Sequence, residues 1–278
     1  MYQVKYKKHE NIFLPCKSKI TGISHMGNDV KLFRVISEEK TDYMPGQFFM
    51  VSTWGAGEVP ISVTSVRKSQ KLIEFAIKRA GTVTTALHKL KRGGTLWLRG
   101  PYGNGFNTAA ARKKDVLIVA GGIGIVPLRP LINIILQHKK QHREIFLLYG
   151  AKNPSGFLFE RDMATWRNKG VDITVTVDRK DKLWKGNVGL VTEHMDKIKT
   201  DFRKAHAYVC GPDIMIENTM KTLSLKGMPD RNIITTLEAR MKCGTGKCGQ
   251  CYHGTEYICT NGPVYTYEEI KKRKAYGP

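Results

Sequence analysis

Short runs of hydrophobic and β-branched residues, each ending near Gly, Asn or Pro, mark the first hundred positions of the chain. The runs cover residues 30–37, 47–53, 61–66, 72–78 and 95–99. Strands at this spacing, with turn residues between them, are typical of an antiparallel barrel or sandwich. One helix is predicted among them, because Val83, Leu87 and Leu90 fall on one helical face. This part of the chain is therefore predicted to be a β domain.

Beyond residue 115, apolar strands alternate with stretches of helical periodicity. Strands are predicted at 116–120, 145–149, 171–177, 207–210 and 233–237, and helices at 127–138, 159–169, 188–197 and 214–226. This alternation indicates a doubly wound parallel sheet with right-handed crossovers. Because such sheets bind ligands at the carboxyl ends of their strands, candidate binding residues are expected there.

From residue 242 onward the chain is rich first in Cys and Gly, and then in Tyr, Glu and Lys. This stretch is too short to form a hydrophobic core of its own, so something else is expected to hold it. The expected organisation is an antiparallel β-barrel over residues 1–107, a parallel-sheet α/β domain over 108–238 and a small C-terminal lobe over 239–278.

Composition agrees with packed domains. The chain has 278 residues, 41% of them hydrophobic, which excludes a disordered or collagen-like protein and suggests about two domains. Its longest apolar run, 116–128, contains three glycines and a proline and is shorter than the roughly 20 residues that span a bilayer. The first ten residues lack the apolar stretch of a secretory signal, so we expect a cytoplasmic protein.

Lys and Arg outnumber Asp and Glu by 46 to 24, for a net charge of +22. Three interpretations remain open: a solvated basic surface, a docking face for an acidic protein, and nucleic-acid binding. No helix-turn-helix, zinc-finger or ribonucleoprotein motif accompanies the charge, which disfavours nucleic acid. The solvated surface is the favoured interpretation.

Four of the six cysteines lie close together near the C-terminus. The first three have the C-x4-C-x2-C spacing of plant-type [2Fe–2S] ligands, and a fourth follows after seven residues, closer than in plant-type ferredoxins. Glycines at 244, 246 and 249 would let the backbone wrap around a cluster without Cβ clashes. A tetrahedral zinc site and disulfides are the alternatives. The candidate metal ligands are Cys243, Cys248, Cys251 and Cys259.

A glycine turn follows the first predicted strand of the α/β domain, at Gly121, Gly122 and Gly124. Glycines there let phosphate oxygens approach backbone N–H groups at a helix N-terminus. The turn departs from G-x-G-x-x-G because Pro127 stands at the last glycine, so a purely structural turn is the alternative. Its place directly after the strand favours a nucleotide site.

The segment Cys210-Gly211-Pro212 ends another predicted strand. By itself, Cys210 is most simply a small buried hydrophobic residue. At the carboxyl end of a strand in this kind of sheet, the segment would line the ligand crevice.

The order of these motifs resembles the ferredoxin–NADP reductase superfamily. Within it, the chain is similar to the flavoprotein electron-transfer subunits of soluble sulfhydrogenases (the gamma subunit) and of anaerobic sulfite reductases, and to the related subunit of dihydroorotate dehydrogenase. The similarity covers nearly the whole chain. It implies FAD on the β-barrel, a nicotinamide cofactor on the α/β domain and a [2Fe–2S] cluster in the C-terminal lobe.

The resemblance also assigns flavin contacts. One segment is similar to the family's Arg-x-[Tyr/Pro]-Ser motif, with Ser62 placed to bond the flavin ring. Glu58 or Val59 replaces the usual arginine, and Lys78 or Arg79 is expected to substitute at the pyrophosphate. The segment consists of Pro60, Ile61, Ser62 and Val63.

Further contacts follow from the same resemblance. Gly81, Val83 and Thr84 resemble the helix N-terminus that receives the FAD pyrophosphate. The stretch 100–106 resembles the loop between the two domains, with a plain glycine turn as the alternative. The glycine turn at 121–124 matches the nicotinamide-dinucleotide turn, and 210–212 matches the motif near the nicotinamide ring.

Asp178 follows a predicted strand at the place where the family contacts the adenosine ribose. A carboxylate there accepts a ribose hydroxyl and repels a 2′-phosphate, although the neighbouring Arg179 would do the reverse. NADH is favoured over NADPH. Tyr252 and His253, between the cluster cysteines, are expected to pack beside the cluster and not to ligate it.

The resemblance implies an oxidoreductase subunit that passes electrons from NADH through FAD and a [2Fe–2S] cluster to a partner redox subunit, such as an anaerobic sulfite reductase or hydrogenase. The alternatives are a subunit of dihydroorotate dehydrogenase and a stand-alone ferredoxin–NAD(P) reductase. No catalytic side chains are expected, because the redox chemistry belongs to the cofactors. The expected assembly is a hetero-oligomer with a catalytic subunit and a further iron–sulfur subunit. Residues 265–272 are expected to pack over the cluster lobe.

Overall fold

The computed structural model describes residues 11–27, 29–65, 71–180 and 182–274. The chain divides into two compact units, which we call the barrel unit and the α/β unit. The barrel unit comprises Met1–Gly105 with Glu238–Pro263, and the α/β unit comprises Phe106–Leu237 with Val264–Pro278. The cysteine-rich segment therefore belongs to the barrel unit, whereas the last residues of the chain belong to the α/β unit.

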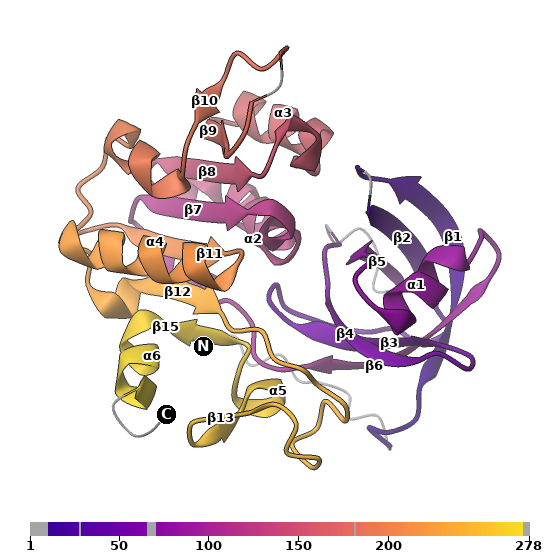
Figure 1. Ribbon diagram of the computed structural model, residues 1–278. Helices are drawn as coiled ribbons and strands as arrows, with labels where there is room; N and C mark the ends of the chain where they lie inside the picture. The colour runs from indigo at the N-terminus through magenta and orange to yellow at the C-terminus, as the bar shows by residue number, and fades with distance from the viewer. Residues whose placement is uncertain (1–10, 28, 66–70, 181, 275–278) are drawn as a thin grey trace. The chain divides into compact units, whose positions relative to one another are not determined.

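The barrel unit contains a six-stranded antiparallel sheet in the order β4-β3-β6-β1-β2-β5. Figure 1 shows these strands together with helix α1. Its core is built from the inward-facing residues of the strands and from Leu87 of the helix, with Phe33, Phe49 and Phe75 fully buried. The elements are β1 (Cys16–His25), β2 (Val30–Ser37), β3 (Phe48–Thr53), β4 (Gly57–Ser62), β5 (Leu72–Lys78), α1 (Thr82–Lys89) and β6 (Thr95–Tyr102). The cysteine segment adds β13 (Tyr252–His253), β14 (Glu256–Tyr257) and α5 (Ile258–Asn261).

Three barrel strands differ from the sequence prediction. Strand β6 runs to Tyr102 and so includes the start of the stretch predicted as an interdomain loop. Strand β1 was not predicted, because its sequence is mostly polar; it forms through pairing with β2 and β6. Strand β4 begins at Gly57, because pairing with β3 continues to the hairpin turn. It ends at Ser62, so 63–65 are not strand, and Val66 of the predicted strand lies outside the described residues.

The α/β unit contains a seven-stranded sheet in the order β10-β9-β8-β7-β11-β12-β15. Strands β7 to β12 all run parallel. Successive strands are added on one side of β7 up to β10, and from β11 onward they are added on its other side, so the strand order reverses between β7 and β11. The strands are β7 (Val116–Gly121), β8 (Ile145–Ala151), β9 (Val171–Val177), β10 (Asn187–Val188), β11 (His206–Cys210), β12 (Ile233–Thr236) and β15 (Val264–Thr266). The helices are α2 (Ile125–Gln137), α3 (Glu160–Asn168), α4 (Asp213–Leu225) and α6 (Tyr267–Lys274), together with short 3₁₀ turns.

Two predictions are corrected in this unit. The helix predicted at 188–197 is a 3₁₀ turn, Val191–Lys197, preceded by strand β10. Residues 265–272 belong to the α/β unit and not to the unit that contains the cysteine segment: β15 pairs antiparallel with β12, and Lys271 of α6 forms an ion pair with Asp230 at 2.6 Å. The physical reason is that the edge of β12 offers unpaired backbone groups, which β15 satisfies.

Candidate functional site

The loop after Cys243 directs backbone N–H groups at cysteine sulfurs. The amides of Thr245, Lys247 and Cys248 each lie 3.4 Å from the Sγ of Cys243, and the amide of Gly246 lies 3.2 Å from the Sγ of Cys259. Hydrogen bonds of this kind favour anionic sulfur. The loop therefore suits thiolate ligands of a cluster.

Three glycines give this loop its shape. Gly244, Gly246 and Gly249 all have φ of +75°, a conformation that L side chains rarely adopt. At Gly244 a Cβ atom would also lie 3.1 Å from Cγ of Met50 and 3.0 Å from the ring of Tyr102. The loop thus lies directly against the barrel, and only glycine fits at the point of contact.

Burial and hydrogen bonding divide the cysteines. Cys251 and Cys259 are buried and Cys248 is exposed. Burial opposes ionisation of Cys243, but the backbone amides outweigh it and lower its pKa to about 6. Burial, with a hydrogen bond to Cys251, raises the pKa of Cys259 to about 12. Within the part of the chain that the structure describes, no group of three or more His, Cys, Asp or Glu side chains is arranged to hold a metal ion.

The stretch predicted as an interdomain loop holds the end of the cysteine segment. The backbone N–H of Asn104 donates to the carbonyl of Gly262 at 2.6 Å, and its side-chain amide donates to Asn261 at 3.1 Å. A Cβ atom at Gly103 would clash with Pro263. These contacts fix the cysteine segment to the turn that follows β6, at a second point.

The proposed flavin segment lies on β4, and its side chains alternate between two faces. Val59, Ile61 and Val63 pack in the barrel core, which leaves Pro60 and Ser62 on the other face. On that face Pro60 is opposite Met50 of β3, the residue that meets the cysteine loop. The flavin segment and the cysteine loop therefore share one face of the barrel sheet.

Glu58 has a counterion that sequence analysis missed. Arg99 of β6 donates to both carboxylate oxygens, from Nε at 2.8 Å and from Nη2 at 2.5 Å. This hydrogen bonding raises the pKa of the Arg99 guanidinium despite its burial. A glutamate in place of an arginine was the available signal, because a half-buried carboxylate requires a positive partner.

The N-terminus of α1 is open to a ligand. Gly81 is exposed, and a Cβ atom there would meet nothing within 4 Å. The Oγ1 of Thr84 accepts from the backbone N–H groups of Ala80 and Gly81, both at 2.9 Å, so this side chain organises the turn. Lys78 is exposed nearby in sequence, whereas Arg79 is paired with Asp29 at 3.0 Å.

The two glycine motifs of the α/β unit meet where the strand order reverses. A Cβ atom at Gly124 would collide with the carbonyl of Cys210, and one at Gly211 would lie 3.0 Å from the amide of Gly121. Gly122 has φ of +50°. Because β7 and β11 are adjacent parallel strands, this is the crevice in which such sheets bind ligands.

Comparisons with known proteins give the same architecture. Models of the oxidoreductase FAD-binding domain, the oxidoreductase NAD-binding domain and the iron–sulfur cluster binding domain of dihydroorotate dehydrogenase B match residues 17–106, 118–221 and 238–271. The sulfhydrogenase 1 gamma subunit of Pyrococcus furiosus is 36% identical over 84% of this chain and 82% of its own. A probable dihydroorotate dehydrogenase B electron transfer subunit of Pyrococcus horikoshii is 36% identical over 88% and 87%.

The chain belongs to the ferredoxin–NADP reductase superfamily. Among solved structures, a chain of an NADH-dependent reduced ferredoxin–NADP oxidoreductase has a TM-score of 0.74 at 27% identity and covers 93% of this chain and 92% of its own. The predicted family and fold class are thereby confirmed. As a member of this superfamily, the protein is an electron-transfer flavoprotein with FAD-binding, NAD-binding and iron–sulfur domains. None of the described helices is both long and apolar enough to cross a membrane.

The Cys210 side chain and Asp178, two predicted nucleotide contacts, lie away from the point where the two glycine motifs meet, although the Cys210 carbonyl is part of that meeting point. The Cys210 side chain is buried, and its Sγ lies 3.3 Å from Oγ1 of Thr236, so its thiol points into the sheet region. Asp178 is exposed just after β9, where its backbone N–H donates to Ala151 at 3.0 Å. It lies at the carboxyl end of the second strand from β7.

A group of aromatic side chains at the same edge of the sheet was not predicted. The Tyr149 hydroxyl donates to the carbonyl of Gly122 at 3.0 Å and accepts from the amide of Leu158 at 3.1 Å. Phe157 packs on Tyr149 and stacks with Trp184 at 5.6 Å. The available signal was the position of these aromatics in or just after β8 and beyond β9.

Proposed function

We propose that this protein oxidises NADH and delivers electrons singly, through FAD and a [2Fe–2S] cluster, to a catalytic redox subunit in a hetero-oligomer. The observation that carries the proposal is the loop of backbone amides around Cys243 and Cys259, packed on the same sheet face as the flavin segment. The cluster ligands would be Cys243, Cys248, Cys251 and Cys259.

The chemistry that a bound FAD would supply is acceptance of a hydride from NADH and release of the two electrons one at a time. The role of the chain's own residues would be to bind and orient the two cofactors. Ser62 would bond the flavin ring, and the open N-terminus of α1 at Gly81, with Lys78, would hold the pyrophosphate. The glycines of the β7–α2 turn, with the 210–212 segment, would hold the dinucleotide.

Asp178 favours NADH over NADPH, because a carboxylate near the ribose repels a 2′-phosphate. To test this preference, the ratio of kcat/KM for NADH to kcat/KM for NADPH is measured in the native chain and in Asp178→Asn. The native ratio is expected to exceed one and to fall by about tenfold in the variant, a change of about 1.4 kcal/mol. An unchanged ratio would remove Asp178 from the proposed ribose site.

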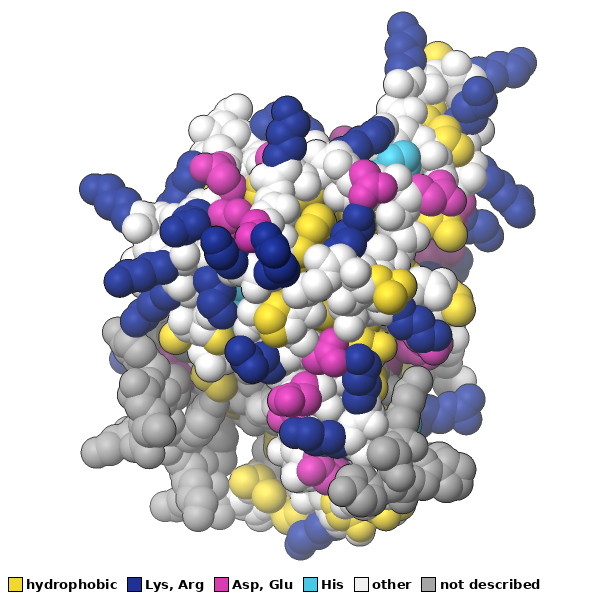
Figure 2. Space-filling model, turned by 90° about the vertical axis from the view of Figure 1, so that its left-hand side faces the viewer, with side chains coloured by type: hydrophobic (Ala, Val, Ile, Leu, Met, Phe, Trp, Pro, Cys, Tyr) yellow, Lys and Arg dark blue, Asp and Glu magenta, His cyan; other side chains and the backbone are white. Residues whose placement is uncertain are grey.

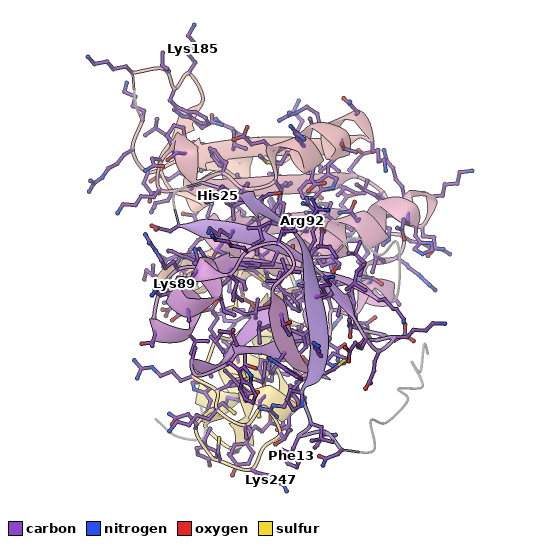
Figure 3. The ribbon with its side chains drawn as sticks, turned by 90° about the vertical axis from the view of Figure 1, so that its right-hand side faces the viewer. Phe13, His25, Lys89, Arg92, Lys185 and Lys247 are labelled. Atoms are coloured by element: carbon purple, nitrogen blue, oxygen red, sulfur yellow. The ribbon has the colours of Figure 1, made fainter. Side chains whose placement is uncertain are left out.

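Electrons would leave the protein near Cys248, the exposed cysteine of the set. Beside it the ammonium nitrogen of Lys247 lies 4.7 Å from the centre of the Phe13 ring. Figure 3 shows both residues at the edge of the cysteine segment. Ile12 and Leu14 add exposed apolar surface from the same short segment. A partner protein that covered this patch would bring its own redox centre close to the cluster.

An anaerobic visible spectrum before and after addition of NADH tests the proposal. Flavin bands on an iron–sulfur background, bleached by NADH, are expected. A chain that contained zinc and neither iron nor flavin, even after anaerobic reconstitution, would overturn the proposal and identify a zinc-binding module.

The relatives are subunits of a sulfhydrogenase and of a probable dihydroorotate dehydrogenase B. We propose a hydrogenase or sulfite reductase subunit in a cytoplasmic complex as the partner, with dihydroorotate dehydrogenase as the alternative. Purification from the native source, followed by assay of the co-purified subunits with each substrate, separates these. A chain that purified alone and reduced free ferredoxin would instead be a stand-alone reductase.

A further inference from the structure

A buried ion pair connects β4, the strand that carries the proposed flavin segment, to Cys243, the first cysteine of the cysteine loop. Arg99 is only 7% exposed, and its guanidinium holds the Glu58 carboxylate of β4 through two hydrogen bonds. Its third nitrogen, Nη1, donates to the carbonyl oxygen of Cys243 and to the hydroxyl of Tyr102, both at 3.1 Å. The Arg99 side chain therefore contacts both β4 and Cys243, a proposed cluster ligand.

The geometry of these contacts requires a guanidinium. Its fixed planar fork can serve a carboxylate on one edge and two further acceptors on the other, whereas a lysine ammonium is a point charge. Tyr102 extends the network, because its hydroxyl donates in turn to the carbonyl of Ile12 at 2.6 Å. Arg99 thereby joins β4, β6, the cysteine loop and the segment before β1.

Charge balance is the second feature of this network. Arg99 lies beside the cluster loop, and its pairing with Glu58 leaves a net charge near zero there. Reduction adds one electron to an iron–sulfur cluster, so an unbalanced positive charge nearby favours the reduced state and a negative charge opposes it.

We propose that Arg99 is a positioning residue for the iron–sulfur cluster: it holds Cys243 against the barrel and, together with Glu58, sets the reduction potential of the cluster. The inference rests on the proposed function, because it assumes a cluster at Cys243. It adds a role for two residues that lie outside the ligand set.

The test is an anaerobic redox titration of the full-length holoprotein, followed by electron paramagnetic resonance of the reduced cluster. Glu58→Gln leaves Arg99 unbalanced and is expected to make the potential more positive. Arg99→Met leaves Glu58 unbalanced and is expected to make it more negative. Each shift is expected to change the reduced-to-oxidised ratio at fixed potential by about tenfold, or about 59 mV for one electron.

The barrel offers a matched control. Arg34 of β2 and Glu74 of β5 form another cross-strand ion pair, at 2.9 Å. Arg34→Met and Glu74→Gln remove the same charges from strands that do not touch Cys243. These variants are expected to leave the cluster potential and its spectrum unchanged.

Shifts of opposite sign support the inference, whereas shifts of the same sign, or none, overturn it. If both variants lose their iron, Arg99→Lys and Glu58→Asp decide, because they keep the charges and change only the fit. Loss of iron in Arg99→Lys supports the positioning role, because lysine keeps the charge but lacks the planar fork. Retained iron with a potential close to the native one supports the charge role, and retained iron with a potential shifted by about 59 mV or more, although the charges are kept, overturns it. A native chain without any cluster would refute the proposed function itself, before the variants are compared.

Discussion

Single residues decide whether the cysteine loop can close on the barrel. The sequence shows the spacing of the four cysteines, and the structure shows that the three glycines of the loop have positive φ. The sequence did not show which glycine contacts the barrel, because the contact with Met50 and Tyr102 joins segments far apart in the chain. This distinction between otherwise similar glycines can be tested.

Gly244→Ala is expected to lose most of its iron, because a Cβ atom there meets both the positive φ and the barrel side chains. Gly249→Ala is the matched control: its φ is also +75°, but a Cβ atom would meet nothing within 4 Å. The control carries only backbone strain of about 1–2 kcal/mol. Iron per chain and thermal stability of the purified variants measure the difference, and equal losses would contradict a steric role for the barrel contact.

His206 gives the α/β unit a pH-dependent stability. It lies on β11, and neither ring nitrogen has a hydrogen-bond partner among the described residues. Burial, with the charge of Lys114, lowers its pKa from 6.5 to about 4. The unfolded chain therefore binds the proton more readily, and the free energy of unfolding falls as the pH drops from about 6.5 toward 4, by up to about 3 kcal/mol.

Urea unfolding of native protein and of His206→Phe, followed between pH 4.5 and 7.5, measures this effect. The variant is expected to show a smaller loss of stability on acidification. His138→Gln, which removes an exposed imidazole, is the control and should follow the native curve. Parallel curves for native protein and His206→Phe would show that other groups dominate the acid response.

Elements at the C-terminus complete a sheet that begins more than a hundred residues earlier. Strand β15 extends the α/β sheet beyond β12, and α6 buries Ile270. The helical pattern of 267–274 gave no indication of which unit it joins, because its only strongly apolar position is Ile270. The neighbouring strand pairing made that choice.

Ile270→Ala is expected to lower the free energy of unfolding of the α/β unit by about 2–4 kcal/mol, the usual cost of truncating a buried isoleucine. Leu225→Ala at the end of α4 is the control, because Leu225 is 88% exposed. Urea unfolding followed by tryptophan fluorescence compares the two. A cost below that of the control would show that α6 contributes no packing energy.

Charge is a property of the whole molecule. On the face in Figure 2, Lys and Arg side chains are spread widely, with Asp and Glu among them, as expected for a solvated basic surface. A net charge of +22 still attracts acidic partners at long range, with a screening length of about 10 Å at 0.1 M salt.

Electron transfer to an acidic ferredoxin, supplied as a probe in place of the partner subunit, is therefore expected to slow by about tenfold or more between about 10 mM and 200 mM salt, because steering is screened. Reduction of a small neutral acceptor by the same preparation provides the control and should change little. Stopped-flow rates at several salt concentrations measure both. A salt-independent rate with ferredoxin would show that the basic surface does not guide this encounter.

The sequence by itself determined the two fold classes, most elements of the α/β unit and the candidate ligand and binding motifs, because strand and helix periodicity, glycine turns and cysteine spacing are local properties. Only the tertiary structure decided which segments meet. It placed the cysteine loop on the barrel, β15 beside β12 and Arg99 between Glu58 and Cys243. These choices depend on burial, charge balance and unpaired strand edges, which arise only when distant parts of the chain come together.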